Sequence, residues 1–351
     1  MKILRALPAL AVLLACAGST PSQTDSSSGS TRSADLMMHR PRMEEHMVQS
    51  GTPGIQLYLR NKHLEKISPD RILLFVHGST YPAETSFDLP LGGISFMDFL
   101  ARGGWDVWLV DLRGYGRSTR PPEMDQPPGA NPPLVTTDVA VQDVGSAVDF
   151  ILGQRKAPRL SLMGWSWGTT IMAAYTVRNP DKVAKLVLYA PQWLRTTPSL
   201  ISGEGAYRMV SMDSARDRWL KGVPEDKKKD LIPAGWFEQW AEATLATDPV
   251  GSKHNPPVLR APNGTLRDTK EYWSSGKPYY DPAQIKVPVL IVHAEWDQDL
   301  PNPMPREVFA RLTSAPYRRM VEIGEGTHTV IMEKNRDQLF REIQLFLDEL
   351  R

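Results

Sequence analysis

A serine between two glycines places the tightest constraint on how this chain can fold. Ser166 is the centre of residues 164–168, which read G-W-S-W-G. An apolar run, residues 159–163, precedes this pentapeptide, and a run typical of a helix, residues 169–175, follows it. The pattern predicts a strand that turns directly into a helix. Side chains two residues either side of the serine would clash in so tight a turn, which explains the glycines.

The pentapeptide alone leaves two interpretations of Ser166 open. A helix that begins just after this residue would offer backbone N–H groups and the positive end of its dipole to a negative charge that develops nearby. The serine would then be an exposed nucleophile. The same letters also occur by chance, as a Gly-rich turn with a capping serine. The rest of the chain has to decide between a nucleophile and a capped turn.

Apolar runs alternate with helix-like segments on both sides of this turn. We expect strands at 55–60, 71–76, 105–110, 159–163, 185–190, 287–293 and 319–323, and helices at 95–102, 137–154, 169–175, 305–312 and 336–350. The first segment alternates apolar and polar residues, which predicts a half-exposed edge strand. The second is continuously apolar, which is typical of a strand buried on both faces. Strands that alternate with helices indicate right-handed βαβ units, so we predict an α/β fold with a mostly parallel central sheet flanked by helices.

The alternation stops between residues 192 and 280. Helix-like pieces at 213–221 and 234–246 are punctuated there by proline and glycine, and five of the ten tryptophans of the chain fall in this stretch. The stretch is too long and too aromatic for a simple loop. We therefore predict a helical lid, residues 192–280, inserted into an α/β core of residues 34–191 and 281–351.

The N-terminus has the features of an exported protein. Residues 1–15 are a short basic start followed by small apolar residues, too short for a transmembrane helix but typical of a secretion signal. They lead into L-L-A-C, which resembles the lipobox of bacterial lipoproteins, and the resemblance implies cleavage before Cys16 and lipid attachment to it. The alternative is a plain cleaved signal with a chance cysteine. Cys16 is the only cysteine, which excludes an intramolecular disulfide and a cysteine metal cluster.

The next residues and the charge balance complete this expectation. Residues 16–33 are rich in Ser, Thr and Gly and predict a flexible tether. Ala17 fits sorting to the outer membrane among Gram-negative lipoproteins. We expect a lipid-anchored protein of the cell envelope, at the outer membrane and facing the periplasm or the cell surface. With 41 Lys+Arg and 40 Asp+Glu the net charge is +1, so the chain has no strong positive field that would attract nucleic acid. The sequence also has no apolar run long enough to span a bilayer.

Further motif segments fall at the predicted strand ends. They are H-G at 77–78, D-L-R-G-Y-G-R-S at 111–118, E-W-D at 295–297 and G-T-H at 326–328. Together with the serine turn, their order and spacing resemble the α/β-hydrolase fold family across roughly residues 55–350. The resemblance implies a catalytic triad in the chain order nucleophile, acid, histidine, which Ser166, Asp297 and His328 obey.

These residue types are the ones that acyl transfer requires. A serine hydroxyl is a weak nucleophile at neutral pH, and a histidine, with an ordinary pKa near 6.5, can remove its proton. A carboxylate must hold the imidazole tautomer and stabilise the imidazolium. His328 is the expected base, the alternative being a surface histidine in a turn. Asp297 aligns with the family's aspartate, and Asp299 is the nearby alternative.

The same resemblance implies an oxyanion hole and a substrate pocket. Two backbone N–H groups are expected to form the hole, those of Ser79 and Trp167. A lipase-type H-G-G-G is absent, because residues 79–80 are Ser-Thr. Tryptophans near the triad and in the insertion favour an apolar or aromatic pocket, although they could instead pack the lid on the core. The expected pocket tryptophans are Trp165, Trp193, Trp236, Trp240 and Trp296.

Serine at the turn narrows the expected reaction. Relatives that resemble dehalogenases and epoxide hydrolases carry aspartate there, so the resemblance implies an acyl-enzyme route. We expect a serine hydrolase of small-molecule carboxylic esters with apolar or aromatic groups, since alkoxides leave more easily than amines, with no cofactor and no metal. One alternative is a proline-iminopeptidase-like peptidase, which would need a lid carboxylate such as Glu204, Glu238 or Glu242. Another is an inactive hydrolase fold that serves as an envelope binding protein.

Overall fold

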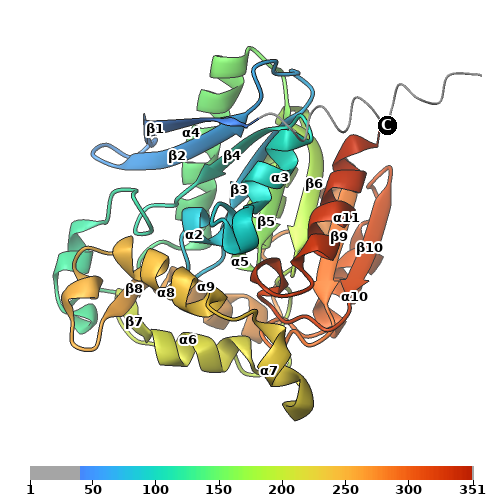
Figure 1. Cartoon of the computed structure of the whole chain (residues 1–351). Coiled ribbons are helices and arrows are strands. Elements are labelled where there is room, and N and C mark those ends of the chain that lie inside the picture. Colours follow the sequence, from blue (N-terminus) through green and yellow to red (C-terminus); the bar gives the residue numbers. More distant parts are fainter. Residues whose placement is uncertain (1–39, 350–351) are drawn as a thin grey trace, which may run out of the picture.

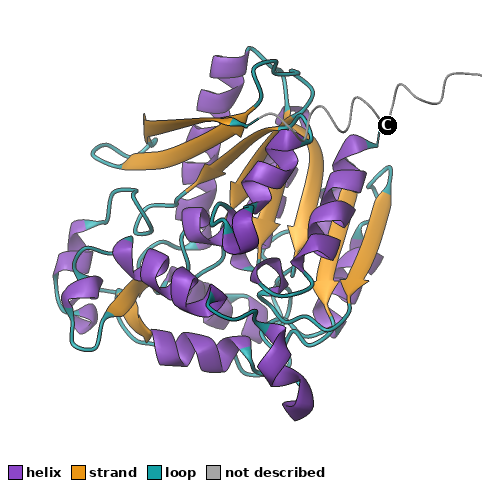
Figure 2. Cartoon of the chain, in the orientation of Figure 1, coloured by secondary structure: helices purple, strands orange, loops and turns teal. Residues whose placement is uncertain are grey.

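An eight-stranded sheet lies at the centre of the computed structural model, which describes residues 40–349 (Figures 1 and 2). Its strands, in spatial order, are β1 (Arg42–Gln49), β2 (Gln56–His63), β4 (Asp106–Val110), β3 (Ile72–Val76), β5 (Leu160–Trp165), β6 (Val183–Tyr189), β9 (Val289–Ala294) and β10 (Arg318–Ile323). The strands from β4 to β10 run parallel to one another, whereas β1 and β2 are antiparallel to their neighbours. The predicted α/β class with a mostly parallel sheet is confirmed.

Helices cover both faces of this sheet (Figure 1). On one face α3 (Phe96–Arg102) packs against α11 (Arg336–Asp348), and on the other α4 (Thr137–Arg155) packs against α5 (Trp167–Arg178). Strands β3, β4 and β5 consist of buried residues throughout, as a strand covered on both faces requires. Two shorter helices, α2 (Ala83–Phe87) and α10 (Pro303–Arg311), complete the core.

The prediction of an edge strand at residues 55–60 is wrong. Strand β2 lies between β1 and β4, and its polar residues are buried or half-buried and have partners: Asn61 Nδ2 donates to Asp106 Oδ1 at 2.7 Å. The apolar–polar alternation therefore marked paired polar groups rather than a solvent face. The edge is formed by β1, which was not predicted and whose residues are mostly exposed.

Between β6 and β9 the chain leaves the sheet, and we call residues 192–280 the insertion. It contains α6 (Met212–Trp219), α7 (Lys228–Leu231), α8 (Trp236–Ala246), α9 (Gly264–Glu271) and an antiparallel pair of strands, β7 (Tyr207–Ser211) and β8 (Val258–Pro262). The insertion lies beyond the arrowheads of the parallel strands (Figure 2). Helices α6 and α8 lie where the sequence predicted them. The prediction of a helical lid did not include the strands β7 and β8.

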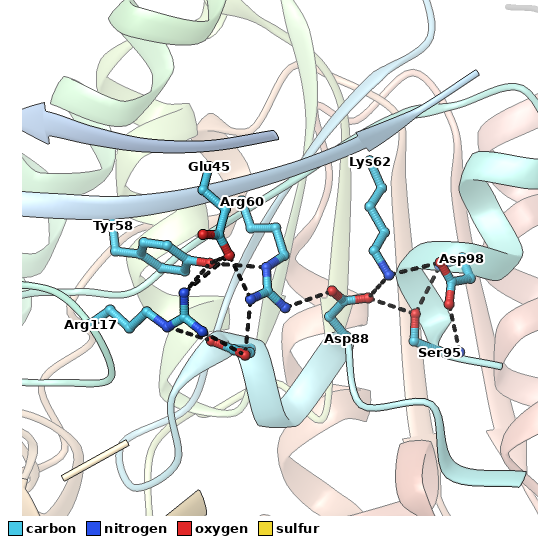
Figure 3. Close-up of polar contacts among 9 residues, drawn as sticks. Glu45, Tyr58, Arg60, Lys62, Asp88, Ser95, Asp98 and Arg117 are labelled. Atoms are coloured by element: carbon cyan, nitrogen blue, oxygen red, sulfur yellow. Dashed lines mark hydrogen bonds and ion pairs between the residues drawn. The ribbon is translucent and has the colours of Figure 1, made fainter. Parts of the chain in front are cut away.

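A cluster of charged side chains ties helix α2 to strand β2 (Figure 3). Arg60 Nη1 donates to Asp88 Oδ2 at 2.9 Å, Lys62 Nζ lies 2.6 Å from Asp88 Oδ1, and an Arg60 nitrogen lies 2.9 Å from a Glu84 oxygen. Only 1% of the Asp88 side chain is exposed. Removing one partner of such a buried pair typically costs about 3–5 kcal/mol, so the cluster firmly holds the chain that follows Ser79.

Some predictions fall outside the described residues. The expected signal peptide at 1–15, the tether at 16–33 and the lipidation residue Cys16 all lie there. Within residues 40–349, no helix is both long enough and apolar enough to cross a membrane.

Candidate active site

Ser166 occupies the turn between β5 and α5, in a conformation that few residues adopt. Its φ is 58° and its ψ is −123°, which is a strained backbone of the kind found at functional sites. A Cβ atom on Gly164 would lie 2.1 Å from the carbonyl oxygen of Gly168, and one on Gly168 would lie 2.7 Å from that of His77. The turn therefore requires glycine at both positions, as the sequence indicated.

The loops after β9 and β10 bring Asp297 and His328 together. His328 Nδ1 lies 2.8 Å from Asp297 Oδ2, and Asp297 Oδ1 accepts a hydrogen bond of 2.9 Å from the Leu300 N–H. The ring nitrogen Nε2 is left for the serine side, and His328 and Ser166 line the same pocket. All three residues are buried. No hydrogen bond joins Ser166 Oγ to another residue in the range 40–349, a looseness that catalytic pairs often have before substrate binds.

Two carboxylates act on the charge of His328. Burial disfavours the imidazolium, but the charges of Asp297 and Asp299 outweigh burial and raise the pKa of His328. Asp299 is held elsewhere, because Arg218 Nε donates to both of its oxygens at 2.9 Å. Burial raises the pKa of Asp299, and the charges of Arg218 and His328 more than offset it, so the net shift is downward. Of the two predicted candidates, it is Asp297 that pairs with the histidine.

The donor atoms of Asp297, Asp299 and His328 lie within 4.8 Å of one another, a spacing at which three ligands can meet on a cation. Each carboxylate already has a partner. Asp297 forms a hydrogen bond with His328, and Asp299 forms an ion pair with Arg218. The residues present are therefore accounted for by a histidine–aspartate pair beside an ion pair.

The predicted oxyanion donors flank the serine. A Cβ atom on Gly78 would lie 3.1 Å from the Ser166 Cβ, so the chain that leads into Ser79 runs against the serine. On the other side, Trp167 is the first residue of α5. Within residues 40–349 the backbone N–H groups of Ser79 and Trp167 find no hydrogen-bond acceptor. Two free donors beside a serine are what the oxyanion of an acyl-transfer intermediate needs.

Buried polar residues of the other motif segments support this loop. His77 Nε2 accepts a hydrogen bond of 3.2 Å from the Leu112 N–H, and burial lowers the pKa of His77 to about 4, which keeps it neutral. Asp111 accepts hydrogen bonds from the N–H groups of Ala83 and Arg117 at 2.8 and 3.0 Å. Both residues therefore hold backbone rather than face the pocket.

The pocket beside Ser166 is narrow, with a volume of about 10 Å³, close to the space of one water molecule. Its lining residues are Gly78, Ser79, Thr80, Tyr81, Trp165, Ser166, Arg218 and His328. Sequence reasoning missed Thr80, Tyr81 and Arg218. No motif marks Arg218, which reaches the pocket only because α6 crosses over the core.

Of the five expected pocket tryptophans, Trp165 alone lines this space. Trp240 lies one layer behind it, with its ring centroid 4.7 Å from that of Tyr81. The remaining three are placed elsewhere: Trp193 packs edge-on against Tyr280, Trp236 lies under the guanidinium of Arg336, and Trp296 is half-buried in the loop after β9. For Trp236 and Trp240, the alternative that tryptophans pack the insertion on the core describes the structure better.

Glu333 was not predicted, yet it forms hydrogen bonds with the residues on both sides of His328. Its carboxylate is fully buried and accepts hydrogen bonds from the Thr327 N–H at 2.9 Å, from the Thr329 hydroxyl at 2.7 Å and from the Thr327 hydroxyl. These two threonines are the neighbours of His328 in the chain. Burial raises the pKa of Glu333 to about 7. Only its distance of five residues from His328 could have drawn attention to it.

Glu333→Gln is expected to flatten the pH dependence of stability. The ordinary pKa is 4.5 and the folded value about 7, so the folded state holds an extra proton between these values. The contribution of Glu333 to the free energy of unfolding should therefore fall by about 3 kcal/mol as pH rises through this window. Urea unfolding at pH 4.5 and 7.5 measures the change, with exposed Glu307→Gln as the control. Parallel pH curves for Glu333→Gln and wild type would contradict the argument.

Comparisons with known proteins agree with the fold. A family model described as the alpha/beta hydrolase fold matches residues 71–335. Among curated proteins, a probable proline iminopeptidase of Leptolyngbya boryana is 24% identical over 164 residues, 46% of this chain and 44% of that protein. Protein ABHD8 of Mus musculus is 24% identical over 273 residues, 75% of this chain and 52% of that protein. The chain thus spans about half or less of the length of these relatives.

Solved structures agree at the level of the fold. One is a membrane phospholipase A described as a bacterial virulence factor, with a TM-score of 0.55 and 20% identity over 92% of this chain and 89% of that one. Another is 2-hydroxy-6-oxo-6-phenylhexa-2,4-dienoate hydrolase of Rhodococcus sp. strain RHA1, with a TM-score of 0.59 and 15% identity over 88% of this chain and 100% of that one.

Proposed function

The chain belongs to the α/β-hydrolase fold family, and from this premise we propose that it is a serine hydrolase of small-molecule carboxylic esters. The observation that carries the proposal is the 2.8 Å contact between His328 Nδ1 and Asp297 Oδ2, in a pocket that His328 shares with Ser166. A buried histidine oriented by a carboxylate and placed beside a strained serine is the arrangement that activates a hydroxyl nucleophile.

The reaction follows from these positions. Ser166 Oγ attacks the ester carbonyl carbon while His328 Nε2 takes its proton, and the carbonyl oxygen becomes an oxyanion that accepts from the Ser79 and Trp167 N–H groups. The intermediate collapses, the C–O bond to the alcohol breaks, and His328 protonates the leaving alkoxide. A water molecule then gives a proton to His328 and attacks the acyl-enzyme, which releases the acid and restores the Ser166 hydroxyl.

The surroundings favour an ester over a substrate with a free amine. An aminopeptidase needs a carboxylate near the nucleophile to hold the substrate ammonium, and the three candidates in the insertion, Glu204, Glu238 and Glu242, are all exposed. Glu238 pairs with Arg216. Among the described residues that line the pocket, the insertion contributes Arg218 and no carboxylate, and Arg218 is already paired with Asp299. Trp165 and Tyr81 supply an apolar wall that suits the apolar or aromatic groups of an ester.

The test is to treat the purified protein with a fluorophosphonate probe and to compare turnover of p-nitrophenyl esters of increasing acyl length with turnover of prolyl p-nitroanilide. We expect labelling and faster ester turnover. Faster prolyl anilide turnover would favour the peptidase. A folded protein that takes up no probe and turns over neither substrate would contradict the enzyme proposal and leave the envelope binding protein.

We also propose that Cys16 carries a lipid that anchors the protein to the cell envelope, because L-L-A-C follows a short basic and apolar start. Cys16→Ser should move the protein from the membrane fraction to the soluble fraction of expressing cells, while Ser19→Ala in the same tether should not. Persistent membrane association of Cys16→Ser would contradict the anchor.

A further inference from the structure

A buried arginine of the insertion, Arg208, hydrogen-bonds to the loop that carries Ser79. Arg208 belongs to strand β7, where it pairs in register with Ala261 of β8. Its side chain reaches the core, where Nη2 donates to the Ser79 carbonyl oxygen at 2.7 Å and to Thr80 Oγ1 at 2.8 Å. The contact joins residues 129 positions apart in the chain, so it exists only when the insertion is seated on the core.

A second guanidinium nitrogen of Arg208 is held within the insertion. Nη1 donates to the Pro262 carbonyl oxygen at 2.9 Å and to Asn263 Oδ1 at 3.3 Å. Asn263 Nδ2 in turn donates to the carbonyl oxygens of Glu204 and Gly205 at 3.1 and 3.2 Å. The planar guanidinium is thus fixed through Nη1 to the insertion, and it holds the core loop at residues 79–80 through Nη2.

We propose that Arg208 is a positioning residue of the oxyanion hole, which it keeps in shape by fixing the backbone at Ser79. This inference rests on the proposed function, because it takes the Ser79 N–H as an oxyanion donor. The Ser79 carbonyl oxygen accepts two hydrogen bonds, from Arg208 and from the Tyr115 hydroxyl at 2.9 Å. The held carbonyl and the catalytic N–H belong to the same residue, so fixing one limits rotation of the other. Preorganised donors stabilise a developing charge without reorganisation at the moment of reaction.

The charge of Arg208 adds to this effect. All of its acceptors are neutral, and no carboxylate bonds to it among residues 40–349. Burial lowers the pKa of Arg208 to about 10, so the guanidinium is still protonated at neutral pH. A buried cation without a counter-ion is unfavourable in the ground state. An oxyanion bound by the Ser79 N–H would bring a negative charge toward this cation, which makes the cation more favourable in the transition state than before it.

The same contacts couple the insertion to catalysis. Arg218 of α6 also reaches Thr80 Oγ1, at 3.3 Å, so both strand β7 and helix α6 meet the core at residues 79–80. Displacement of the insertion would remove one of the two hydrogen bonds to the Ser79 carbonyl oxygen, leaving only that from Tyr115, and would also uncover the pocket. The insertion therefore completes the oxyanion hole in addition to covering it.

The experiment compares Arg208→Met, Arg208→Lys and wild type on a p-nitrophenyl ester and with a trifluoromethyl ketone, which forms a tetrahedral oxyanion adduct on the serine. For Arg208→Met we expect kcat to fall on the order of 100-fold with KM within about threefold, and affinity for the ketone to weaken by the same factor as kcat/KM. Arg208→Lys keeps the charge but not the fork, and we expect a loss on the order of 10-fold. Exposed Arg216→Met, on α6, is the matched control and should behave as wild type.

The outcomes separate the two proposals. A folded Arg208→Met with wild-type kcat would overturn the role of Arg208 and leave the hydrolase intact. If Arg208→Met does not fold, Arg208→Lys decides, and wild-type kcat and ketone affinity for that variant would overturn the inference. A rise in KM with unchanged kcat would also overturn it, because it would indicate a substrate-binding role. A wild-type protein that neither turns over esters nor takes up the fluorophosphonate would remove the proposed function, and the inference with it.

Discussion

Ser166→Ala is expected to lower kcat for ester hydrolysis on the order of 10⁶-fold and to abolish labelling by a fluorophosphonate. In the proposed mechanism the whole covalent route passes through the Ser166 Oγ atom. In the range 40–349, Ser166 Oγ makes no hydrogen bond, so its removal leaves no buried partner unsatisfied. The φ of 58° strains alanine and serine alike, and we expect the melting temperature to stay within a few degrees of wild type.

Titration of active sites with the probe measures the labelling, and thermal unfolding measures the melting temperature. Ser274→Ala, at an exposed position in the insertion, controls for a serine change that should leave labelling intact. A folded Ser166→Ala that still takes up the probe would place the nucleophile elsewhere. Residual activity near wild type would mean that hydrolysis does not use a serine acyl-enzyme at this turn.

What the sequence could predict was local or ordered along the chain. The serine turn needs glycine two residues either side, and the clash distances of Gly164 and Gly168 explain why the pattern is informative. Asp297 and His328 follow parallel strands, whose carboxyl ends meet at one edge of a sheet. Chain order and strand positions were therefore enough to bring them together. Strands and helices of the core were predictable for the same reason, because continuous apolar runs mark strands covered on both faces.

What the sequence could not predict depends on contacts between distant segments. Arg208 reaches Ser79 across 129 positions of the chain, and Arg218 reaches Thr80 across 138. Nothing in the sequence around either arginine marks it. The polar residues of β2 look exposed in the sequence, because pattern alone cannot show that Asn61 and Arg60 have buried partners. The insertion tryptophans look like a pocket lining, since apolar packing and apolar binding use the same residues.

Asp297→Asn is expected to lower kcat on the order of 10⁴-fold at neutral pH, the second largest effect. An amide at position 297 no longer carries the charge that stabilises the imidazolium of His328, and it can present its NH₂ group to Nδ1, which favours the wrong tautomer. The amide is close in size to the carboxylate, and an oxygen can still accept from the Leu300 N–H. The fold should therefore persist, which circular dichroism and thermal unfolding check.

Asp299→Asn is the matched variant that tests which carboxylate is the acid. Asp299 bonds to Arg218 rather than to His328, and it acts on the histidine only through its charge. That charge raises the pKa of His328, so its removal should lower the pKa. Because the proposed base is the unprotonated histidine, the acid limb of the kcat/KM profile should move to lower pH. Asp297 still holds the imidazole, so we expect kcat to fall only on the order of 10-fold. A larger loss for Asp299→Asn than for Asp297→Asn would reverse the assignment, since only the residue that holds the imidazole should cost the larger factor.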